Sequence, residues 1–366
     1  MITQDMLFKG SNYVDEILRK LRRVEGGGAI TLYGAGYCGH EALSLLSKHN
    51  ITVKTICDDF RVGQYLDGIR ITDIKSVVPS EELKIFITSG FNQKMKAKLQ
   101  ELSLIDYYHE LDFGRYDPEK ENYEYFADHI DEINAAYSLL TDEFSKKLFL
   151  NLVNYRISRD ISLLDGMQES TPQYFPEYPD LRSNQGHYFL DLGAYNGDSI
   201  SAFLDYTGGF YGGIYAFEAS RKNYEILVNN TRNMHDVQCF YLAVSDKKEL
   251  VSFNVSDAKN SFADEHGQIK LQADSVDNVL AGKPVTFIKM DVEGAEFKAL
   301  NGAEYTIKTQ LPVMAVSVYH FVEDLFRLQL LIEEFCPGLY DFYLRHYSPT
   351  VIETVLYAIP KVRRNE

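Results

Sequence analysis

The sequence of 366 residues predicts an α/β protein with two α/β units joined by helices. Short apolar stretches rich in β-branched and aromatic residues alternate with segments of helical period, and this alternation occurs twice along the chain. A chain of this length usually divides into more than one hydrophobic core. We therefore expect a first unit over residues 1–114, a helical connector over 115–184 and a second unit over 185–366.

The first unit has the pattern of about half a Rossmann-like fold, in which parallel strands alternate with helices. The expected elements are the strands Ala29–Tyr33, Thr52–Cys57 and Lys84–Thr88, a helix Glu41–Lys48 and a helix that begins near Asn92. In the connector, apolar positions recur at helical spacing over Tyr125–Leu140 and Phe144–Leu164, without any strand pattern.

The second unit contains a longer series of buried strands. They are expected at Tyr188–Leu192, Gly213–Phe217, Val237–Val244, Val285–Met290 and Val313–Tyr319. Two further strands, Tyr340–Tyr347 and Thr354–Ile359, face each other across a short turn and predict a closing antiparallel pair.

Composition narrows the class of protein. Asp and Glu outnumber Lys and Arg by 53 to 37, and the net charge of −16 disfavours nucleic acid and anionic membranes as partners. The four cysteines are scattered without a C-x-x-C pair, which predicts neither a zinc site nor a disulfide framework. We find no signal peptide pattern and no apolar stretch long enough to span a membrane, so we expect a cytoplasmic protein. Homo-oligomer formation stays open.

A glycine-rich turn follows the first strand of the second unit. It reads Asp191-x-Gly193-x-x-x-Gly197, and its glycines let a ligand approach the backbone. Turns that bind dinucleotides carry G-x-G-x-x-G instead, because a pyrophosphate must reach the N-terminus of a helix. Asp191 replaces the first of those glycines, and a carboxylate there repels phosphate and suits the ammonium group of a ligand. The turn therefore points to S-adenosylmethionine, which is cationic and carries no phosphate.

An acidic residue ends the next strand of the same unit. Glu218 follows Ile214–Phe217 and lies 21 residues after Gly197. A carboxylate at the end of a second strand can accept hydrogen bonds from both ribose hydroxyls of a nucleoside. The simpler alternative is that Asp191 caps a helix and Glu218 is a solvated strand end.

A cluster of acids follows a later strand. Asp291, Glu293 and Glu296 come directly after Phe287–Met290 and precede a predicted helix. Ligands of open α/β sheets bind outside the carboxyl ends of the strands, so acids this close together at a strand end belong to a site more often than to a surface.

These segments resemble the FkbM family of S-adenosylmethionine-dependent methyltransferases, from about Gln173 to Pro360. The resemblance rests on matching stretches in the same order, namely Phe189–Asp198, Tyr215–Ala219, Leu242–Asp246, and Ile288–Glu296 with Leu300–Ala303.

The resemblance implies a seven-stranded class I methyltransferase domain that methylates an oxygen, commonly a sugar hydroxyl of a polysaccharide, glycolipid or secondary metabolite. It also implies which residues bind the cofactor. The methionine end would lie against Asp191, Gly193 and Gly197, in the same loop as Tyr195 and Asn196. The ribose would lie on Glu218 and the adenine near Ser245 or Asp246. Tyr195 stands where many members of the family carry Asn.

The residues leave the catalytic chemistry open. Methyl transfer from a sulfonium mainly needs proximity and orientation, but a sugar hydroxyl is a poor nucleophile that a base would activate. His320 follows the strand beside that of Asp291 and is a candidate for this base, with Glu293 and Glu296 in the same pocket. Alternatively, Asp291, Glu293 and Glu296 hold Mg²⁺ or Ca²⁺, which would acidify the hydroxyl, and His320 is a packed residue.

Arg345 and His346, near the end of the penultimate strand, are candidates for acceptor contacts. The alternative is that they only solvate the last hairpin.

A G-x-G-x-x-G pattern lies in the first unit. Gly34, Gly36 and Gly39 stand between a strand and a helix, and Asp58 follows the next strand. With Gly90, this region resembles the N-terminal Rossmann-like domain of nucleotide-sugar acetyltransferases from bacterial glycan pathways. The resemblance implies a nucleotide or nucleotide-sugar site at these five residues. The alternative is a domain kept for packing or dimerisation.

The sequence as a whole favours an O-methyltransferase of glycan biosynthesis, with a small-molecule, saccharide or nucleotide-sugar acceptor. Two other functions stay open. One is an NAD-dependent oxidoreductase of nucleotide-sugars that uses Gly34–Gly39, although the first unit has no Tyr-x-x-x-Lys pair. The other is a scaffold that binds nucleotide without catalysis.

Overall fold

The computed structural model describes residues 1–10, 18, 29–88, 92–109, 117–176, 186–254, 262–263, 269–348 and 351–361. Contacts within the chain divide it into two compact units. The N-terminal unit comprises Leu7–Phe126 and Asn154–Leu163, and the C-terminal unit comprises Met1–Met6, Ala127–Val153 and Leu164–Glu366. Residues 115–184, the expected connector, are thus shared between the two units, and the boundaries at 114 and 184 stay predictions.

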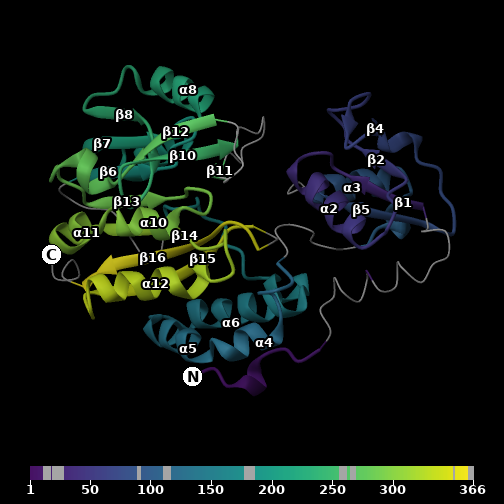
Figure 1. Ribbon diagram of the computed structural model, residues 1–366, viewed down its shortest axis with the longest axis horizontal. Helices are drawn as coiled ribbons and strands as arrows, with labels where there is room; N and C mark the ends of the chain where they lie inside the picture. Colours follow the sequence, from purple (N-terminus) through teal and green to yellow (C-terminus); the bar gives the residue numbers. More distant parts are fainter. Residues whose placement is uncertain are drawn as a thin grey trace. The chain divides into compact units, whose positions relative to one another are not determined.

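The described part of the N-terminal unit contains a five-stranded sheet in the order β3-β4-β2-β1-β5 (Figure 1). The strands are β1 (Ala29–Tyr33), β2 (Thr55–Cys57), β3 (Tyr65–Leu66), β4 (Ile69–Thr72) and β5 (Leu83–Ile87). All pairs are parallel except β3 with β4. The unit also contains α2 (Tyr37–Lys48), α3 (Asn92–Glu101), η2 (Ile74–Ser76) and η3 (Ile105–Tyr107). The α/β alternation predicted from the sequence is confirmed.

The hairpin of β3 and β4 is missing from the expected elements. Its turn is Asp67-Gly68, and both residues have positive φ, at 46° and 83°. Asp-Gly in this conformation is a preferred two-residue hairpin turn because its twist matches that of the strands. The strands around it are too short to show an alternating pattern, so the dipeptide was the only available signal.

Seven described strands form the sheet of the C-terminal unit, in the order β15-β16-β14-β13-β6-β7-β8 (Figure 1). They are β6 (His187–Leu192), β7 (Tyr211–Glu218), β8 (Val237–Tyr241), β13 (Phe287–Met290), β14 (Val313–Ser317), β15 (Tyr340–His346) and β16 (Thr354–Pro360). The pairs from β8 to β14 are parallel, and β16 is antiparallel to both β14 and β15. The expected seven-stranded sheet and its closing antiparallel pair are confirmed.

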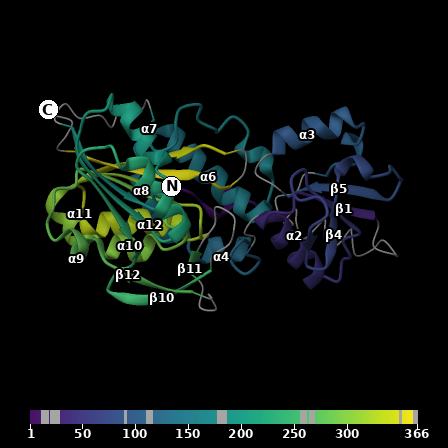
Figure 2. The same cartoon turned by 90° about the horizontal axis from the view of Figure 1, so that it is seen from above.

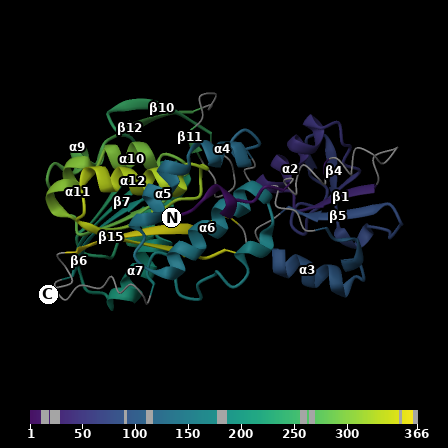
Figure 3. The ribbon, with the colours of Figure 1, turned by 90° about the horizontal axis from the view of Figure 1, so that it is seen from below.

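Helices cover both faces of this sheet. Figures 2 and 3 show α10 and α11 on one face and α7 on the other. The helices after β6 are α7 (Asp198–Thr207), α8 (Arg221–Thr231), α9 (Val276–Leu280), α10 (Glu296–Asn301), α11 (Glu304–Gln310) and α12 (Asp324–Phe335). A small second sheet, in the order β11-β10-β12-β9, contains β9 (Ala243–Val244), β10 (Glu249–Asn254), β11 (Phe262–Ala263) and β12 (Ile269–Asp274).

Aromatic side chains fill the core under β6. Phe189 stacks on Phe203 of α7 with ring centroids 4.4 Å apart, and Phe175 packs 6.1 Å from Phe189 and 6.0 Å from Phe203. Buried aromatic rings contribute large apolar areas, so this cluster holds the chain before β6 firmly against the sheet. Tyr174, which precedes Phe175, is thereby fixed near the carboxyl ends of the strands.

The edge strand β15 is covered by the helices that precede β6. These are α4 (Tyr123–Asp128), α5 (Ile130–Leu139) and α6 (Glu143–Ser158), with η1 (Gln4–Met6) and η4 (Ile161–Leu164). The N–H of Phe342 donates to Thr141 Oγ1 at 3.2 Å, that of Leu344 donates to Ser145 Oγ at 2.8 Å, and the carbonyl of His346 accepts from Glu169 N at 2.7 Å. No helix in the described parts of the chain is long and apolar enough to cross a membrane.

Candidate active site

The glycine-rich turn after β6 packs against the end of β13. Gly193 has φ +82°, and a Cβ on it would lie 1.8 Å from the carbonyl oxygen of Asp291. Only glycine fits this close approach of two backbones. Gly197, with φ +89°, is the N-cap of α7, and Tyr195 between them has φ +49°. The side chain of Asn196 accepts from Asp198 N at 3.1 Å, which fixes the start of that helix.

Asp191 is fully buried under this turn. Lys289 Nζ lies 3.2 Å from its Oδ1 and also donates to the carbonyl of Gly193 at 2.6 Å, and the hydroxyl of Ser199 donates to its Oδ2. Burial raises the pKa of Asp191, and the charge of Lys289 opposes this shift. An ammonium group does lie on Asp191, but it belongs to the protein. This corrects the expectation that the carboxylate binds the ammonium of the ligand.

Glu218 at the end of β7 holds the turn from its other side. Its Oε2 accepts from the backbone N of Tyr195 at 2.8 Å, and its Oε1 accepts from that of Ser220 at 2.7 Å. The side chain is largely buried, and burial raises its pKa against the effect of these two hydrogen bonds. Each carboxylate oxygen retains a further lone pair, so Glu218 can still accept from ribose hydroxyls.

The two residues expected near adenine differ in exposure. Ser245 is buried, and its hydroxyl lies 2.6 Å from Glu249 Oε1 and 3.1 Å from Asp246 Oδ1. Asp246 is exposed. Of the two, Asp246 is therefore the side chain that a ligand can reach.

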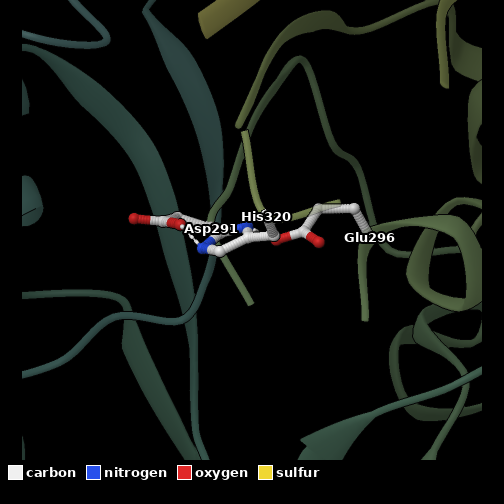
Figure 4. A group of neighbouring side chains, drawn as sticks. All are labelled: Asp291, Glu296 and His320. Atoms are coloured by element: carbon white, nitrogen blue, oxygen red, sulfur yellow. Dashed lines mark ion pairs between the residues drawn. The ribbon is translucent and has the colours of Figure 1, made fainter. Parts of the chain in front are cut away.

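His320, which follows β14, lies between Asp291 and Glu296, two of the acids after β13 (Figure 4). His320 Nδ1 lies 2.9 Å from Glu296 Oε1, and Nε2 lies 3.4 Å from Asp291 Oδ1 and 3.5 Å from Glu293 Oε2. The side chains of His320 and Glu296 have no exposed surface, whereas 21% of that of Asp291 is exposed. The structure thus brings together all four residues expected at the catalytic site, and Asp291 is more open than His320.

The surroundings of His320 favour its protonated form. Burial alone would lower the pKa of His320, but the carboxylates of Glu296, Glu293 and Asp291 raise it well above its usual value. An imidazole that already carries both protons cannot accept another from a substrate. The role of His320 as the base stays a prediction, and these surroundings favour the buried ring as a counter-ion for the carboxylates around it.

Two tyrosines that the sequence did not single out fix Asp291. Tyr174 OH donates to Oδ2 at 2.8 Å, and Tyr319 OH donates to Oδ1 at 3.3 Å. Burial would raise the pKa of Asp291, but the charges of His320 and Lys289 and the bond from Tyr174 hold it below its usual value. Asp291 is therefore an ionised and oriented carboxylate.

The same residues have the donor atoms for a metal ion. One ligand atom from each of Asp291, Glu296 and His320 lies within 4.8 Å of the others. A histidine nitrogen must be unprotonated to bind a metal, whereas both nitrogens of His320 face carboxylates that favour the protonated ring. Ion pairs account for this arrangement without a metal.

Comparison with protein families decides the class of enzyme. Residues 191–341 match the family model of the methyltransferase FkbM domain. The chain carries an FkbM methyltransferase domain. It is accordingly a methyltransferase, and the match supports S-adenosylmethionine as the methyl donor. The expected FkbM domain and the expected enzyme class are confirmed over the oxidoreductase and the non-catalytic scaffold.

One solved structure confirms the fold, and a second gives a weaker match. The methyltransferase FkbM from Methylobacillus flagellatus KT matches with a TM-score of 0.70 and 19% identity, over 96% of this chain and 94% of that chain. Fibrillarin from Aeropyrum pernix, solved with natively bound S-adenosyl-L-methionine, matches with a TM-score of 0.32 and 10% identity, over 48% of this chain and 67% of that chain. No curated protein sequence matches the chain.

Arg345 and His346 lie away from solvent in the unit that carries the FkbM domain. Arg345 pairs with Asp142 at 2.7 Å and with Glu169 at 3.2 Å, and His346 Nδ1 lies 2.9 Å from Thr354 Oγ1. Both residues are buried. They hold the edge of the sheet, which corrects both the expected acceptor contact and the solvated alternative.

Asp324 also faces the acid cluster of the FkbM domain. It lies at the start of α12, and burial together with the charge of Glu296 raises its pKa to about 7. Asp324 and the two tyrosines come from segments without a motif. Their places follow from the tertiary fold, so a sequence pattern gave no signal for them.

The glycines of the N-terminal unit, outside the FkbM domain, have different surroundings from one another. A Cβ on Gly34 would lie 2.5 Å from the carbonyl oxygen of Thr88, and one on Gly39 would lie 2.2 Å from that of Gly34. A Cβ on Gly36 would meet nothing within 4 Å. Packing thus explains why Gly34 and Gly39 are glycine, but it does not explain Gly36.

Asp58 accepts a hydrogen bond from the backbone of the N-terminal glycine loop, as Glu218 does from the turn after β6. Its Oδ2 accepts from Ala35 N at 2.9 Å, and its Oδ1 accepts from Phe60 N at 2.8 Å. The carboxylate therefore joins the glycine loop to the loop after β2. Gly90, the remaining expected residue of the nucleotide site, lies outside the described residues.

Proposed function

We propose that the chain transfers the methyl group of S-adenosylmethionine to a sugar hydroxyl of a small-molecule or saccharide acceptor. One observation carries the proposal. The backbone of Asp291 touches Gly193 of the glycine-rich turn. An oriented and partly exposed carboxylate therefore lies directly beside the turn that would bind the methyl donor. A base beside a methyl donor is what transfer to an alcohol requires.

The cofactor site uses the carboxyl ends of neighbouring strands. The turn from Gly193 to Gly197, with Tyr195 and Asn196, would bind the methionine end through its backbone. Glu218 would accept hydrogen bonds from the ribose, and Asp246 would lie near the adenine. Asp191 and Lys289 lie on the buried side of the turn. Their ion pair and the hydrogen bond from Lys289 to the Gly193 carbonyl fix the conformation of the turn.

The acceptor hydroxyl donates to Asp291. As its oxygen forms the bond to the methyl carbon and the bond from that carbon to sulfur breaks, its proton passes to the carboxylate and S-adenosylhomocysteine leaves. A weak base is sufficient because the sulfonium is a good leaving group. His320 and the hydroxyls of Tyr174 and Tyr319 hold Asp291 in place. The carboxylates of Glu293 and Glu296 favour the protonated form of His320.

Asp291→Asn tests this assignment. The amide keeps the shape of the side chain but cannot take the proton, so we expect transfer of tritiated methyl groups to a panel of glycosides and nucleotide-sugars to fall roughly 10²–10⁴-fold. Binding of S-adenosylhomocysteine, measured by calorimetry, should persist. Asp205→Asn, on the exposed face of α7, is the matched control. Full activity in Asp291→Asn would remove Asp291 as the base.

Chelation separates the base from a metal. Because ion pairs account for the cluster, we expect wild-type activity to survive EDTA. Activity that disappears with EDTA and returns only with Mg²⁺, Mn²⁺ or Ca²⁺ would establish the metal mechanism instead.

A further inference from the structure

Two polar side chains border the acid cluster and lie outside residues 191–341, the part that matches the family model. They are Gln173 and Glu353, and the amide nitrogen of Gln173 donates to Oε2 of Glu353. Gln173 directly precedes Tyr174, whose hydroxyl contacts Asp291 at 2.8 Å. The pair is thus tied to the catalytic carboxylate through one neighbouring residue.

Strand direction explains how Glu353 reaches this site. The parallel strands β13 and β14 end at the sheet edge where Asp291 and His320 follow them. β16 is antiparallel to β14, with Val355 opposite Ser317 and the carbonyl of Thr354 accepting from Val318 N at 3.0 Å. An antiparallel strand begins where its parallel neighbours end. Glu353, the residue before β16, therefore arrives at the same edge as the catalytic residues.

Glu353 and the residue after Gln173 have an uncommon backbone conformation. Glu353 has φ +61°, and Tyr174 has φ +69°. Residues other than glycine seldom adopt such values, and these conformations persist where the surroundings fix them. A carboxylate at a position that suits glycine or asparagine indicates a role for the side chain itself.

The charge around Glu353 also distinguishes it from a surface carboxylate. Burial and the charge of Asp291 raise its pKa, with a further contribution from Glu293. Among the described residues, Gln173 is the partner of its carboxylate, and Oε1 accepts no hydrogen bond from them. The proposed methyl transfer leaves this oxygen unused.

We propose that Gln173 and Glu353 form an acceptor subsite that hydrogen-bonds a second hydroxyl, adjacent to the one that is methylated. The inference rests on the proposed function. Amide and carboxylate groups together provide a donor and an acceptor, and a diol offers both in return. The favoured acceptor is therefore a vicinal diol, as in a sugar ring, rather than an alcohol or phenol with one isolated hydroxyl.

Binding of deoxy sugars to the full chain tests the subsite. A panel of methyl hexopyranosides and their monodeoxy analogues is titrated by ligand-detected NMR in the presence of saturating S-adenosylhomocysteine. We expect wild type to bind at least one parent glycoside about 10- to 100-fold more tightly than one of its deoxy analogues, since a lost hydrogen bond to a charged group has this effect. Glu353→Gln should weaken the parent to the level of that analogue and leave affinity for S-adenosylhomocysteine unchanged.

Two further variants complete the test. Gln173→Ala removes the donor that orients Glu353, so it should reduce the same preference even if Glu353→Gln fails to fold. Glu304→Gln, on the half-exposed pair with Lys308 of α11, should behave as wild type. Unchanged discrimination in both site variants would overturn the subsite. So would a wild type that binds S-adenosylhomocysteine but no glycoside, whereas loss of S-adenosylhomocysteine binding itself would overturn the proposed function.

Discussion

At the scale of single residues, the backbone contact between Gly193 and Asp291 has the sharpest consequence. In Gly193→Ala, an alanine would have to adopt the positive φ of this position. Its Cβ would also clash with a carbonyl oxygen 1.8 Å away. Gly208→Ala is the control, because it has φ +63° and nothing within 4 Å of its Cβ. The control should lose about 1–2 kcal/mol of unfolding free energy, as for a left-handed alanine.

Gly193→Ala should lose roughly 1–3 kcal/mol more, the range for overpacking. It should also bind S-adenosylhomocysteine less tightly, because the turn is displaced. Denaturant unfolding and calorimetry measure both effects. Equal stability of the two variants would show that the turn moves freely and that the close approach is unimportant.

Glu218 should matter for the cofactor in two ways. It holds the turn through Tyr195 N and offers lone pairs to the ribose. We expect Glu218→Ala to weaken S-adenosylhomocysteine binding by about 1–3 kcal/mol in calorimetry. Glu225→Gln, an exposed residue of α8 paired with Arg221, should bind as wild type does. An unchanged affinity of Glu218→Ala would exclude this carboxylate from the site.

The raised pKa of His320 predicts how its contribution to stability depends on pH. A group whose pKa is higher in the folded state stabilises fully below its unfolded pKa of about 6.5, and this contribution is lost as pH rises through the folded value. His320→Gln leaves three carboxylates without their counter-ion, which costs about 3–5 kcal/mol for a buried pair.

Thermal melts of wild type and His320→Gln between pH 6 and pH 10 check this dependence. The deficit of the variant should be largest at pH 6 and shrink as pH rises. His235→Gln, an exposed histidine beside Asp236, should show no such trend. A constant deficit across this range would mean that His320 is neutral in the folded protein, and would restore it as a candidate base.

Residue roles were only partly predictable from sequence. The spacing of Glu218 from the turn and the acids after β13 predicted residues that the structure does bring to one edge of the sheet, because strand ends converge in this architecture. Sequence could not show that Lys289 covers Asp191, since that pairing depends on the register of β13 with β6. Nor could it show that three carboxylates enclose His320 and favour its protonated form.

At the scale of secondary structure elements, Asp142 links α6 to the edge strand. Its carboxylate accepts from Ser145 N at 2.7 Å and pairs with Arg345 at 2.7 Å. Burial would raise the pKa of Asp142, but the hydrogen bonds of Arg345 and Ser145 lower it overall. This stabilisation is present above the unfolded pKa of about 3.9 and is lost as pH falls through the folded value.

We expect Asp142→Ala to lose about 0.5–2 kcal/mol at pH 7, the range for a lost helix cap. Asp142→Asn keeps an acceptor for Ser145 N and should lose less. Urea unfolding at pH 7 and at pH 3 measures the difference in stability between each variant and wild type, which should be smaller at the acidic pH. A difference that stays the same at both values would exclude the ionised carboxylate as its cause.

Elements with a clear period were predictable, and short or paired ones were not. The seven strands of the C-terminal sheet are apolar and bounded by turns, so each was placed within a few residues. β9 and β8 were expected as one strand, Val237–Val244, because no turn residue separates them. The strands β10 to β12 were not expected, since their pairing with β9 exists only in the folded chain.

At the scale of the whole molecule, the N-terminal glycine loop stays a prediction as a nucleotide site. Gly36→Val in the full chain tests it, because its side chain would meet no protein atom and the fold should be unaffected. Gly39→Ala is the contrast, since its Cβ would clash with the Gly34 carbonyl and lower stability.

Thermal melts with UDP-, GDP- and CDP-sugars provide the measurement, since a ligand that binds the folded state raises the melting temperature. Wild type should shift with at least one of them, and Gly36→Val should not. No shift in wild type with any nucleotide-sugar would identify the unit as structural.

The cover over β15 has a consequence for solubility. An edge strand with unpaired N–H and C=O groups is a template on which another chain can add a strand. Thr141, Ser145 and Glu169 bond to the outward backbone groups of Phe342, Leu344 and His346, so that template is already occupied. Fragments that begin after these residues would keep the FkbM domain yet leave the outward backbone groups of β15 without partners. Such fragments should therefore aggregate by strand addition, even where their own sheet is intact.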